Sequence, residues 1–375
     1  MTIASERQLI AETVAEFVER EVRPAAAEAD ETQTFPEDVW DGLAELDLTG
    51  LTVPEEYGGF DADQLTYSIV NEELARGDLS VATALSVHCL ATSCIQQFGT
   101  DAHREAWLPD MAAGRPVGAF ALSEPDAGSN HDGMTTQARK EGDEYVIDGT
   151  KQWITNGQRS DVVILFAKTD RDDPDTVTQF LVPKDTDGLA VGKKEDKLGL
   201  RASDTTSLVF DDVRIPAENR LTEVGEGMSA ALHILTGGRI GIASQSVGLA
   251  QSALDAAVEY AHEREQFDRP IRTFQGVGFK IADMCMDVEA ARLLTLQAAH
   301  AMDRGERGTL EAARAKTYAT DVAMETATEA VQIHGGVGYS KDYPVERYMR
   351  EANGTQIYEG TNEINRQVIV NHLYD

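Results

Sequence analysis

The segment IYEGTN, residues 357–362, places a single glutamate, Glu359, between a tyrosine and a glycine. A carboxylate becomes a useful general base when an apolar enclosure removes water and raises its pKa. The same residues also fit a structural role. Thr361 can cap a helix formed by NEINRQVIVNHL, and the helix dipole favours an acid just before a helix. In a chain with 65 acidic residues, composition alone favours the structural role.

The stretch FALSEPDAGSN, residues 120–130, is a candidate ligand-binding loop. Pro, Asp and Gly favour tight turns, so backbone N–H groups and the hydroxyls of Ser123 and Ser129 can face a ligand. A turn that merely joins two elements explains the same composition, and for the stretch in isolation it is the favoured interpretation.

The stretch KQWITNGQ, residues 151–158, offers an aromatic surface on a predicted strand. Trp153 has a flat face on which a conjugated ring can stack. Thr155 lies two residues further on and therefore points to the same side of a strand. A core tryptophan followed by an Asn-Gly hairpin turn is an equally good interpretation of this stretch.

Two further stretches combine arginine, glutamine and glycine. Arg264 and Phe267 lie in HEREQFDRPI with Gln275 shortly after, and Gln332 and Gly336 lie in QIHGGVGY. Arginine beside glycines can bind a pyrophosphate, because glycine permits a close backbone approach. A helix that ends at a glycine cap explains QIHGG equally well.

The charge of the chain excludes several classes of partner. Lys+Arg 33 against Asp+Glu 65 gives a net charge of −32. This charge repels phosphates and anionic lipids, so we expect no nucleic acid and no membrane insertion. Because the acids are spread along the chain, we interpret the charge as a whole-surface, halophilic adaptation to high salt.

The sequence predicts a soluble, cytoplasmic protein. The three cysteines (Cys89, Cys94 and Cys285) lack metal-ligand spacing and suit a reducing compartment, so no metal site is expected. The start MTIASERQLI lacks the features of a signal peptide. No apolar run approaches the length needed to span a bilayer.

The elements that must position the candidate residues change in kind along the chain. Residues 1–115 have helical periodicity, 116–220 contain short β-branched runs between turn residues, and 221–375 return to long helices. This order predicts an α+β multidomain protein with an N-terminal helical domain, a middle β-barrel or sandwich domain and a C-terminal four-helix bundle. It argues against a doubly wound nucleotide-binding fold. The chain also lacks a phosphate-binding loop, HExxH and a nucleophile elbow.

Taken in order, these stretches resemble the acyl-CoA dehydrogenase family over essentially the whole chain. The resemblance includes LTVPEEYGG, LGLRASDTTSLVFDDVRIP, GGRIGIASQSVGLAQSALD and KDYPVERYMREANGTQIYEGTNEINR. It implies a helical domain, a β domain and a helical bundle, assembled as a homotetramer with FAD in each subunit. One departure is Asp126, where the family more often has glycine. Aspartate tolerates the same turn, so we expect the loop to survive.

The resemblance assigns roles to individual residues. Leu122 and Ser123 match contacts to the pyrimidine edge of the flavin. Ser129 matches a residue near the cofactor phosphate and the pantetheine of the substrate. Trp153 and Thr155 match residues beside the flavin ring, with Thr155 near N5.

Other matches concern a neighbouring subunit and the substrate. Thr361 and Glu363 match adenosine-side contacts. Arg239 matches an arginine near the acyl-CoA, and Tyr358 and Gly360 are expected to contact the substrate beside it. The residues that match contacts to the FAD of a neighbouring subunit are Arg264, Phe267, Gln275, Gln332 and Gly336.

Glu359 matches the catalytic base of the main branch of the family. Some relatives place the base just before the arginine that Arg239 matches. That position is Gly238 here, so Glu359 is the single candidate. The resemblance implies that Glu359 takes the α-proton, that flavin N5 accepts a hydride from the β-carbon, and that a trans-2-enoyl-CoA forms. The electrons then pass to electron-transfer flavoprotein.

We therefore predict an FAD-dependent acyl-CoA dehydrogenase of the short- to medium-chain or branched-chain type, acting in fatty acid or amino acid breakdown. One alternative is an oxidase on the same fold that uses oxygen, although the long C-terminal extension typical of such oxidases is lacking. Another is a non-catalytic flavoprotein that binds nucleic acid or a protein partner. Glu359 and the charge of −32 argue against this last alternative.

Overall fold

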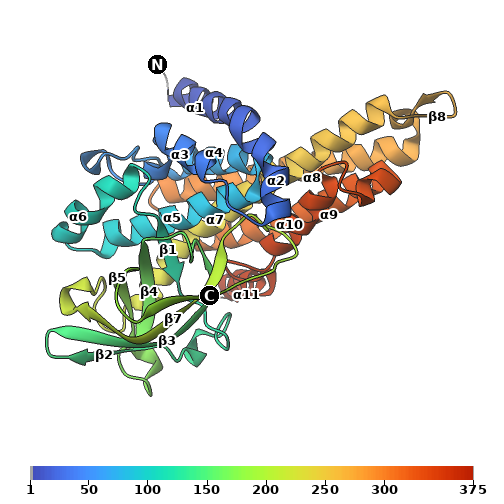
Figure 1. The fold of residues 1–375 in the computed structure, drawn as a ribbon. Coiled ribbons are helices and arrows are strands. Elements are labelled where there is room, and N and C mark those ends of the chain that lie inside the picture. Colours follow the sequence, from blue (N-terminus) through green and yellow to red (C-terminus); the bar gives the residue numbers. More distant parts are fainter. Residues whose placement is uncertain (1–2, 375) are drawn as a thin grey trace.

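The computed structural model describes residues 3–374, in which helices, strands and helices again follow one another along the chain (Figure 1). This order confirms the predicted fold class of N-terminal helical domain, middle β domain and C-terminal helical domain. The helices of the first part are α1 (Ile3–Phe17), α2 (Arg23–Thr32), α3 (Glu37–Glu45), α4 (Gln64–Gly77), α5 (Leu79–Phe98) and α6 (Asp101–Ala112). The strands of the middle part are β1 (Gly118–Ala121), β2 (Gln137–Glu141), β3 (Glu144–Thr155), β4 (Val162–Lys168), β5 (Val177–Pro183), β6 (Leu189–Lys194) and β7 (Thr205–Pro216). The last part contains α7 (Gly227–Glu263), the hairpin strands β8 (Glu265–Gln266) and β9 (Arg269–Pro270), α8 (Gln275–Asp303), α9 (Thr309–His334), α10 (Val345–Thr355) and α11 (Asn362–Tyr374).

The middle part forms one seven-stranded sheet in the order β1-β4-β2-β3-β7-β6, with β5 paired to β4. Every residue of β4, VVILFAK, is buried, as expected for a strand covered on both faces. β1 runs into the candidate loop 120–130, and β3 contains Trp153 and Thr155. The sheet therefore carries both candidate stretches.

Helix α5 lies at the centre of the molecule and packs on both α7 and β1 (Figure 1). It begins at a cap in which Asp78 accepts the backbone N–H groups of Ser80 and Val81, at 2.6 and 3.1 Å. Among the described residues, α5 is the one helix long and apolar enough to cross a membrane. The expectation that no apolar run reaches such a length was therefore wrong. Its apolar window is 89% buried inside the protein, which is typical of a core helix.

Two hydrophobic clusters tie the parts together. One joins the N-terminal helices to the C-terminal bundle and includes Leu85 on α5 and Leu249 on α7. The other joins α5, the loop after β1 and the start of α7 through Leu90, Leu122 and Ile234. The two helical parts thus share one core, and the loop after β1 is packed against both α5 and α7. The predicted domain ranges 1–115, 116–220 and 221–375 remain predictions.

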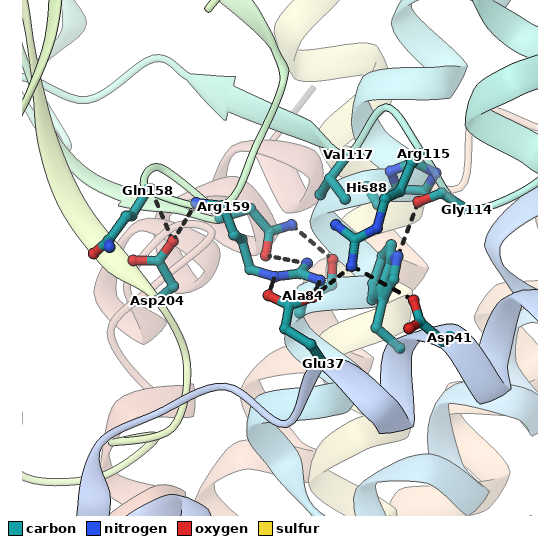
Figure 2. A network of polar contacts seen from close by, with 12 residues as sticks. Glu37, Asp41, Ala84, His88, Gly114, Arg115, Val117, Gln158, Arg159 and Asp204 are labelled. Carbon is teal, nitrogen blue, oxygen red and sulfur yellow. Dashed lines mark hydrogen bonds and ion pairs between the residues drawn. The ribbon is translucent and has the colours of Figure 1, made fainter.

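A polar network fixes the β domain on the N-terminal helices (Figure 2). Arg159, in the turn after β3, donates to both carboxylate oxygens of Glu37 on α3, at 3.0 and 2.8 Å. Its guanidinium also lies 4.1 Å from the ring centroid of Phe35 and 4.3 Å from that of Trp40. Asp204 accepts the backbone N–H of Arg159 at 2.8 Å. The turn is thus held by charge, by aromatic faces and by its own backbone.

The same turn is also held from α5. Asn156 donates from Nδ2 to the carbonyl oxygens of Ala84 and Gly118, at 3.0 and 3.2 Å. The Gly118 N–H donates to Nδ1 of His88 at 3.0 Å, and Nε2 of His88 lies 3.1 Å from the Met111 carbonyl oxygen. These partners suit the neutral imidazole, and burial lowers the pKa of His88 to about 4. We call the side chains of Glu37, His88, Asn156 and Arg159 the docking network.

Candidate active site

Glu359 lies in a tight turn between α10 and α11. Both Glu359 and Gly360 have left-handed backbone conformations, with φ of 53° and 89°, and this conformation is uncommon for a residue with a side chain. The Gly360 carbonyl accepts hydrogen bonds from Lys316 Nζ at 2.9 Å and from Asn365 Nδ2 at 2.8 Å. Thr361 Oγ1 accepts the Ile364 N–H at 3.3 Å, so Thr361 does cap the start of α11. The turn is therefore anchored on its C-terminal side, at the Gly360 carbonyl and at Thr361.

The carboxylate of Glu359 is enclosed although the residue as a whole is only half-buried. Its Oε2 has no hydrogen-bond partner among residues 3–374. Burial raises the pKa of Glu359 to about 7, against the opposing charges of Arg239 and Lys316. The interpretation of Glu359 as an ordinary solvated acid before a helix is therefore wrong. A general base that works near neutral pH needs a pKa in this range, and the enclosure of Glu359 provides it.

Gly238 on α7 faces the carboxylate. A Cβ atom built there would lie 2.4 Å from Glu359 Oε2 and 3.2 Å from Leu90. Glycine at this position makes room for the glutamate. Position 238, which the resemblance offers as the alternative place for a base, could therefore not carry a side chain without displacing the carboxylate of Glu359.

A cavity of about 60 Å³ lies beside Gly238. It is lined by Tyr67 on α4, Leu90 on α5, Ile234 on α7 and Met302 at the end of α8. The Glu359 carboxylate, which faces Gly238, therefore lies next to a small space between four helices. A substrate chain placed there would present its carbon atoms to an enclosed base.

The candidate loop and the candidate strand are joined by a buried ion pair. Lys151 on β3 donates from Nζ to the Leu122 carbonyl at 2.9 Å and to Glu124 Oε1 at 2.8 Å. The Gln152 N–H also donates to the Ser123 carbonyl at 2.9 Å. The Lys151 side chain is fully buried. Leu122 and Ser123 are thus fixed against the strand that carries Trp153 and Thr155.

Trp153 projects from the sheet. The pairing of β3 with β7 is irregular between Lys151 and Ile154, and Trp153 within this bulge has a φ of 63°. Its side chain is 59% exposed, whereas Ile154 is buried and Thr155 is half-buried. The alternative interpretation of Trp153 as a core residue is therefore wrong. Ser129 is likewise exposed at the end of the candidate loop.

Five predicted residues lie at the opposite end of the bundle. The β8–β9 hairpin carries Phe267, next to Arg264 and close to Gln275 at the start of α8, and it lies far from the β domain (Figure 1). Tyr260 and His334 stack there with ring centroids 4.3 Å apart, which places the end of α9 beside the end of α7. The predicted residues at this end are Arg264, Phe267, Gln275, Gln332 and Gly336.

The structure thus divides the predicted residues into separate groups. Tyr358, Gly360 and Thr361 lie in the turn with Glu359, and Arg239 is buried within electrostatic reach of it. Glu363 is exposed on the first turn of α11. Gly335 caps α9 with a φ of 64°, so the helix-cap interpretation of QIHGG is right for its first glycine. The assigned contacts of all these residues remain predictions.

The side chains present fit FAD. The exposed ring of Trp153 provides a face on which a flat heterocycle can stack. The fixed backbone of Leu122 and Ser123 lies beside it. Phe267 is 87% exposed beside exposed Arg264, a combination that suits an aromatic and phosphate-bearing group. These two surfaces lie at opposite ends of the chain (Figure 1).

Sequence reasoning missed three buried charged residues. Glu124 and Lys151 hold the candidate loop to β3, and Lys316 anchors the turn of Glu359. The chain has only ten lysines, and Lys316 interrupts the Ala-rich helical stretch EAARAKTYATDVA. A scarce lysine among alanines was the one available signal. It did not indicate what the ammonium contacts.

Comparisons with known proteins show the family of the chain. The acyl-CoA dehydrogenase models of the N-terminal, middle and C-terminal domains match residues 4–115, 119–213 and 225–374. The short-chain specific acyl-CoA dehydrogenase, mitochondrial, of Rattus norvegicus is 45% identical over 368 residues, which cover 98% of this chain and 89% of the relative.

Two solved structures extend the likeness to the whole fold. Butyryl-CoA dehydrogenase from Megasphaera elsdenii superposes with a TM-score of 0.97 at 43% identity, covering 100% of both chains. A chain from the structure of the electron transferring flavoprotein of Acidaminococcus fermentans also gives 0.97, at 42% identity, covering 100% of this chain and 98% of that one. The chain therefore belongs to the acyl-CoA dehydrogenase family, and it is an FAD-dependent enzyme of that family.

Proposed function

We propose that the enzyme converts short-chain acyl-CoA thioesters to trans-2-enoyl-CoA with Glu359 as the base that takes the α-proton. The observation that carries this proposal is the enclosed Oε2 of Glu359, which lacks a partner among the described residues and faces Gly238 beside a cavity. Bound FAD supplies the acceptor for the hydride that leaves the β-carbon.

The chain contributes positioning and electrostatics to this reaction. Arg239 and Lys316 keep the pKa of Glu359 from rising further than about 7, so a large fraction of the carboxylate is ionised at neutral pH. The backbone N–H of Glu359 donates to the thioester oxygen as that oxygen gains negative charge. The enclosure excludes water, which would otherwise solvate the carboxylate and weaken it as a base.

The size of the cavity supports a short acyl chain. A cavity of about 150 Å³ is sufficient for benzene, whereas the space beside Gly238 measures about 60 Å³. The names of two relatives, short-chain specific acyl-CoA dehydrogenase and butyryl-CoA dehydrogenase, point to the same substrate class.

We further propose a homotetramer with electron-transfer flavoprotein as the electron acceptor. Phe279, Met286 and Leu293 recur every seven residues along α8, and all three are more than half exposed. An uncovered apolar stripe of this length is typical of a helix that packs against another subunit. A cytoplasmic location and an adaptation to high salt complete the proposal.

Anaerobic mixing of the holoenzyme with butyryl-CoA tests the proposed function. We expect rapid loss of the flavin absorbance and formation of a trans-2-enoyl-CoA. Unchanged absorbance with every short, medium and branched acyl-CoA would refute it. In a second step, reoxidation by electron-transfer flavoprotein is expected to be much faster than reoxidation by oxygen. Fast peroxide formation would instead indicate an oxidase.

A further inference from the structure

Lys316 is a buried charge that the proposed reaction does not use directly. It lies on α9, its side chain is fully buried, and its ammonium donates to the Gly360 carbonyl at 2.9 Å and to Asn362 Oδ1 at 3.0 Å. Burial lowers its pKa to about 8, and the charge of Glu359 opposes this effect. Keeping an ammonium in such a place costs free energy unless its charge is compensated.

The contacts of Lys316 are concentrated on the turn that carries Glu359. The Gly360 carbonyl has two donors, the charged Lys316 and the neutral Asn365. Asn362, the other partner of Lys316, also donates to Asp321 at 2.9 Å and so ties the start of α11 to α9. The C-terminal side of the left-handed Glu359–Gly360 pair is therefore held from α9 and α11.

We propose that Lys316 is a positioning residue for the base: its ammonium holds the Glu359–Gly360 turn in its left-handed conformation, and its charge favours the ionised form of Glu359. This inference rests on the proposed role of Glu359. It adds to that role a specific source for both the geometry and the charge state of the carboxylate.

Charged and titratable groups face Glu359 from several elements. Arg239 on α7 is the other cation, and Tyr67 on α4 and the adjacent Tyr358 are phenols whose pKa values burial raises, so they stay neutral. His131, from the β domain, lies within electrostatic reach of Arg239 and has a pKa lowered by burial. Lys316 and Arg239 are therefore the two positive charges that act on the carboxylate among the described residues.

The inference predicts separate effects of charge and of hydrogen bonding. Lys316→Gln keeps a neutral donor near the Gly360 carbonyl but removes the charge, so the pKa of Glu359 should rise by about one unit. Lys316→Arg keeps the charge and should restore most of the original value. Asn365→Leu removes the neutral anchor of the same carbonyl, so it should slow the chemistry without moving the pKa.

Exchange of the methyl protons of acetyl-CoA with solvent deuterium measures the base without flavin reduction. Acetyl-CoA has α-hydrogens but no β-carbon, so no hydride can leave. The C–H bond breaks, the proton passes to Glu359, the electron pair stays on the thioester as an enolate, and a deuteron returns. NMR of the holoenzyme with acetyl-CoA gives the exchange rate as a function of pH. Thermal melts check that each variant is folded.

We expect the wild-type rate to rise with a midpoint near pH 7, the value to which burial raises the pKa of Glu359. The midpoint should move up by about one pH unit in Lys316→Gln, return in Lys316→Arg and stay unchanged in Asn365→Leu. Superposable pH profiles for wild type and Lys316→Gln would overturn the role of Lys316. Exchange that persists in Glu359→Gln would instead overturn the base itself, so the two failures are distinguishable.

Discussion

The docking network and the turn of Glu359 are both polar and at least partly buried, but they differ in how their polar atoms are satisfied. All three guanidinium nitrogens of Arg159 have acceptors, and both ring nitrogens of His88 have partners. In the second region Oε2 of Glu359, Nε of Arg239 and the hydroxyl of Tyr358 have no partner within residues 3–374. Buried polar atoms are normally paired, because leaving one unpaired costs about 1–3 kcal/mol.

This difference separates a structural region from a chemical one. The docking network is satisfied within the chain, so it stabilises one arrangement of the β domain on the helices. The region around Glu359 retains unpaired groups that a substrate can use, at a cost to the stability of the free protein. Variants in the first region should therefore lower stability and leave the chemistry intact. Variants in the second region should impair the chemistry with little loss of stability.

Arg159→Met should give the largest loss of stability. It removes the ion pair with Glu37 and the contacts with the rings of Phe35 and Trp40, so we expect a loss of about 3 kcal/mol in the free energy of unfolding. Turnover per folded molecule should change little. Denaturant unfolding measures the loss, and Arg304→Met, which breaks the exposed Arg304–Glu306 pair, is the matched control. Equal losses in the two variants would contradict a stabilising role of the Arg159 contacts.

Gly238→Ala should lower activity with little loss of stability. The new Cβ would meet Glu359 Oε2 at 2.4 Å and push the carboxylate aside, and displacing a catalytic group by about 1 Å costs about 10²-fold. Gly248→Ala on the same helix is the contrast. There the Cβ would meet the Glu72 backbone carbonyl at 2.1 Å, so stability should fall and turnover per folded molecule should persist. Steady-state kinetics and thermal melts of both variants provide the comparison, and a fully active Gly238→Ala would contradict it.

The two regions should respond to pH in opposite directions. The pKa of His88 is lowered from 6.5 to about 4 by burial, so its contribution to stability is present above pH 6.5 and is lost as the pH falls towards 4. Between pH 6.5 and 5 the loss is about 2 kcal/mol. The pKa of Glu359 is raised from 4.5 to about 7, so its contribution falls as the pH rises from 4.5 to 7.

Urea unfolding at several pH values separates the two effects. His88→Gln should flatten the acid limb, and Glu359→Gln should make the protein more stable than wild type at pH 8, by about 1–3 kcal/mol. A Glu359→Gln variant less stable than wild type at pH 8 would mean that the carboxylate is not strained by its enclosure.

Salt should produce the smallest effect, and it should act on the whole surface. With a net charge of −32, screening reduces self-repulsion, so we expect about 1 kcal/mol of added stability between 0.1 and 1 M salt. The docking network and the enclosed Glu359 should contribute little to this gain, because buried pairs are screened weakly. Thermal melts of wild type and Arg159→Met at both salt concentrations check it, and a gain confined to one of them would locate the effect in the network.

The sequence predicted the order of elements and the residue types of the site, because both leave local patterns. Periodicity indicated the helices of the first and last parts, and the short β-branched runs of residues 116–220 indicated the strands between them. The sequence predicted an aromatic surface at Trp153, but a buried core tryptophan explained the same pattern equally well. The bulge that exposes it depends on pairing with β7, which is distant in sequence.

The geometry that distinguishes Glu359 from the other acids was beyond local patterns. Its enclosure depends on Gly238 and Lys316, which lie 121 and 43 positions away in the sequence. The left-handed turn depends on donors from α9 and α11. Family resemblance supplied the assignment of the base, and the fold supplies the physical reason for it. The docking network left no signal, because its members come from three distant segments.

Single-turnover flavin reduction by butyryl-CoA in Glu359→Gln, compared with wild type, tests the central claim most directly. The amide keeps the size of the side chain but cannot accept the α-proton, so we expect the rate of flavin reduction to fall by about 10²- to 10⁴-fold while butyryl-CoA still binds. Reduction at the wild-type rate would contradict the account and would place the base elsewhere in the protein.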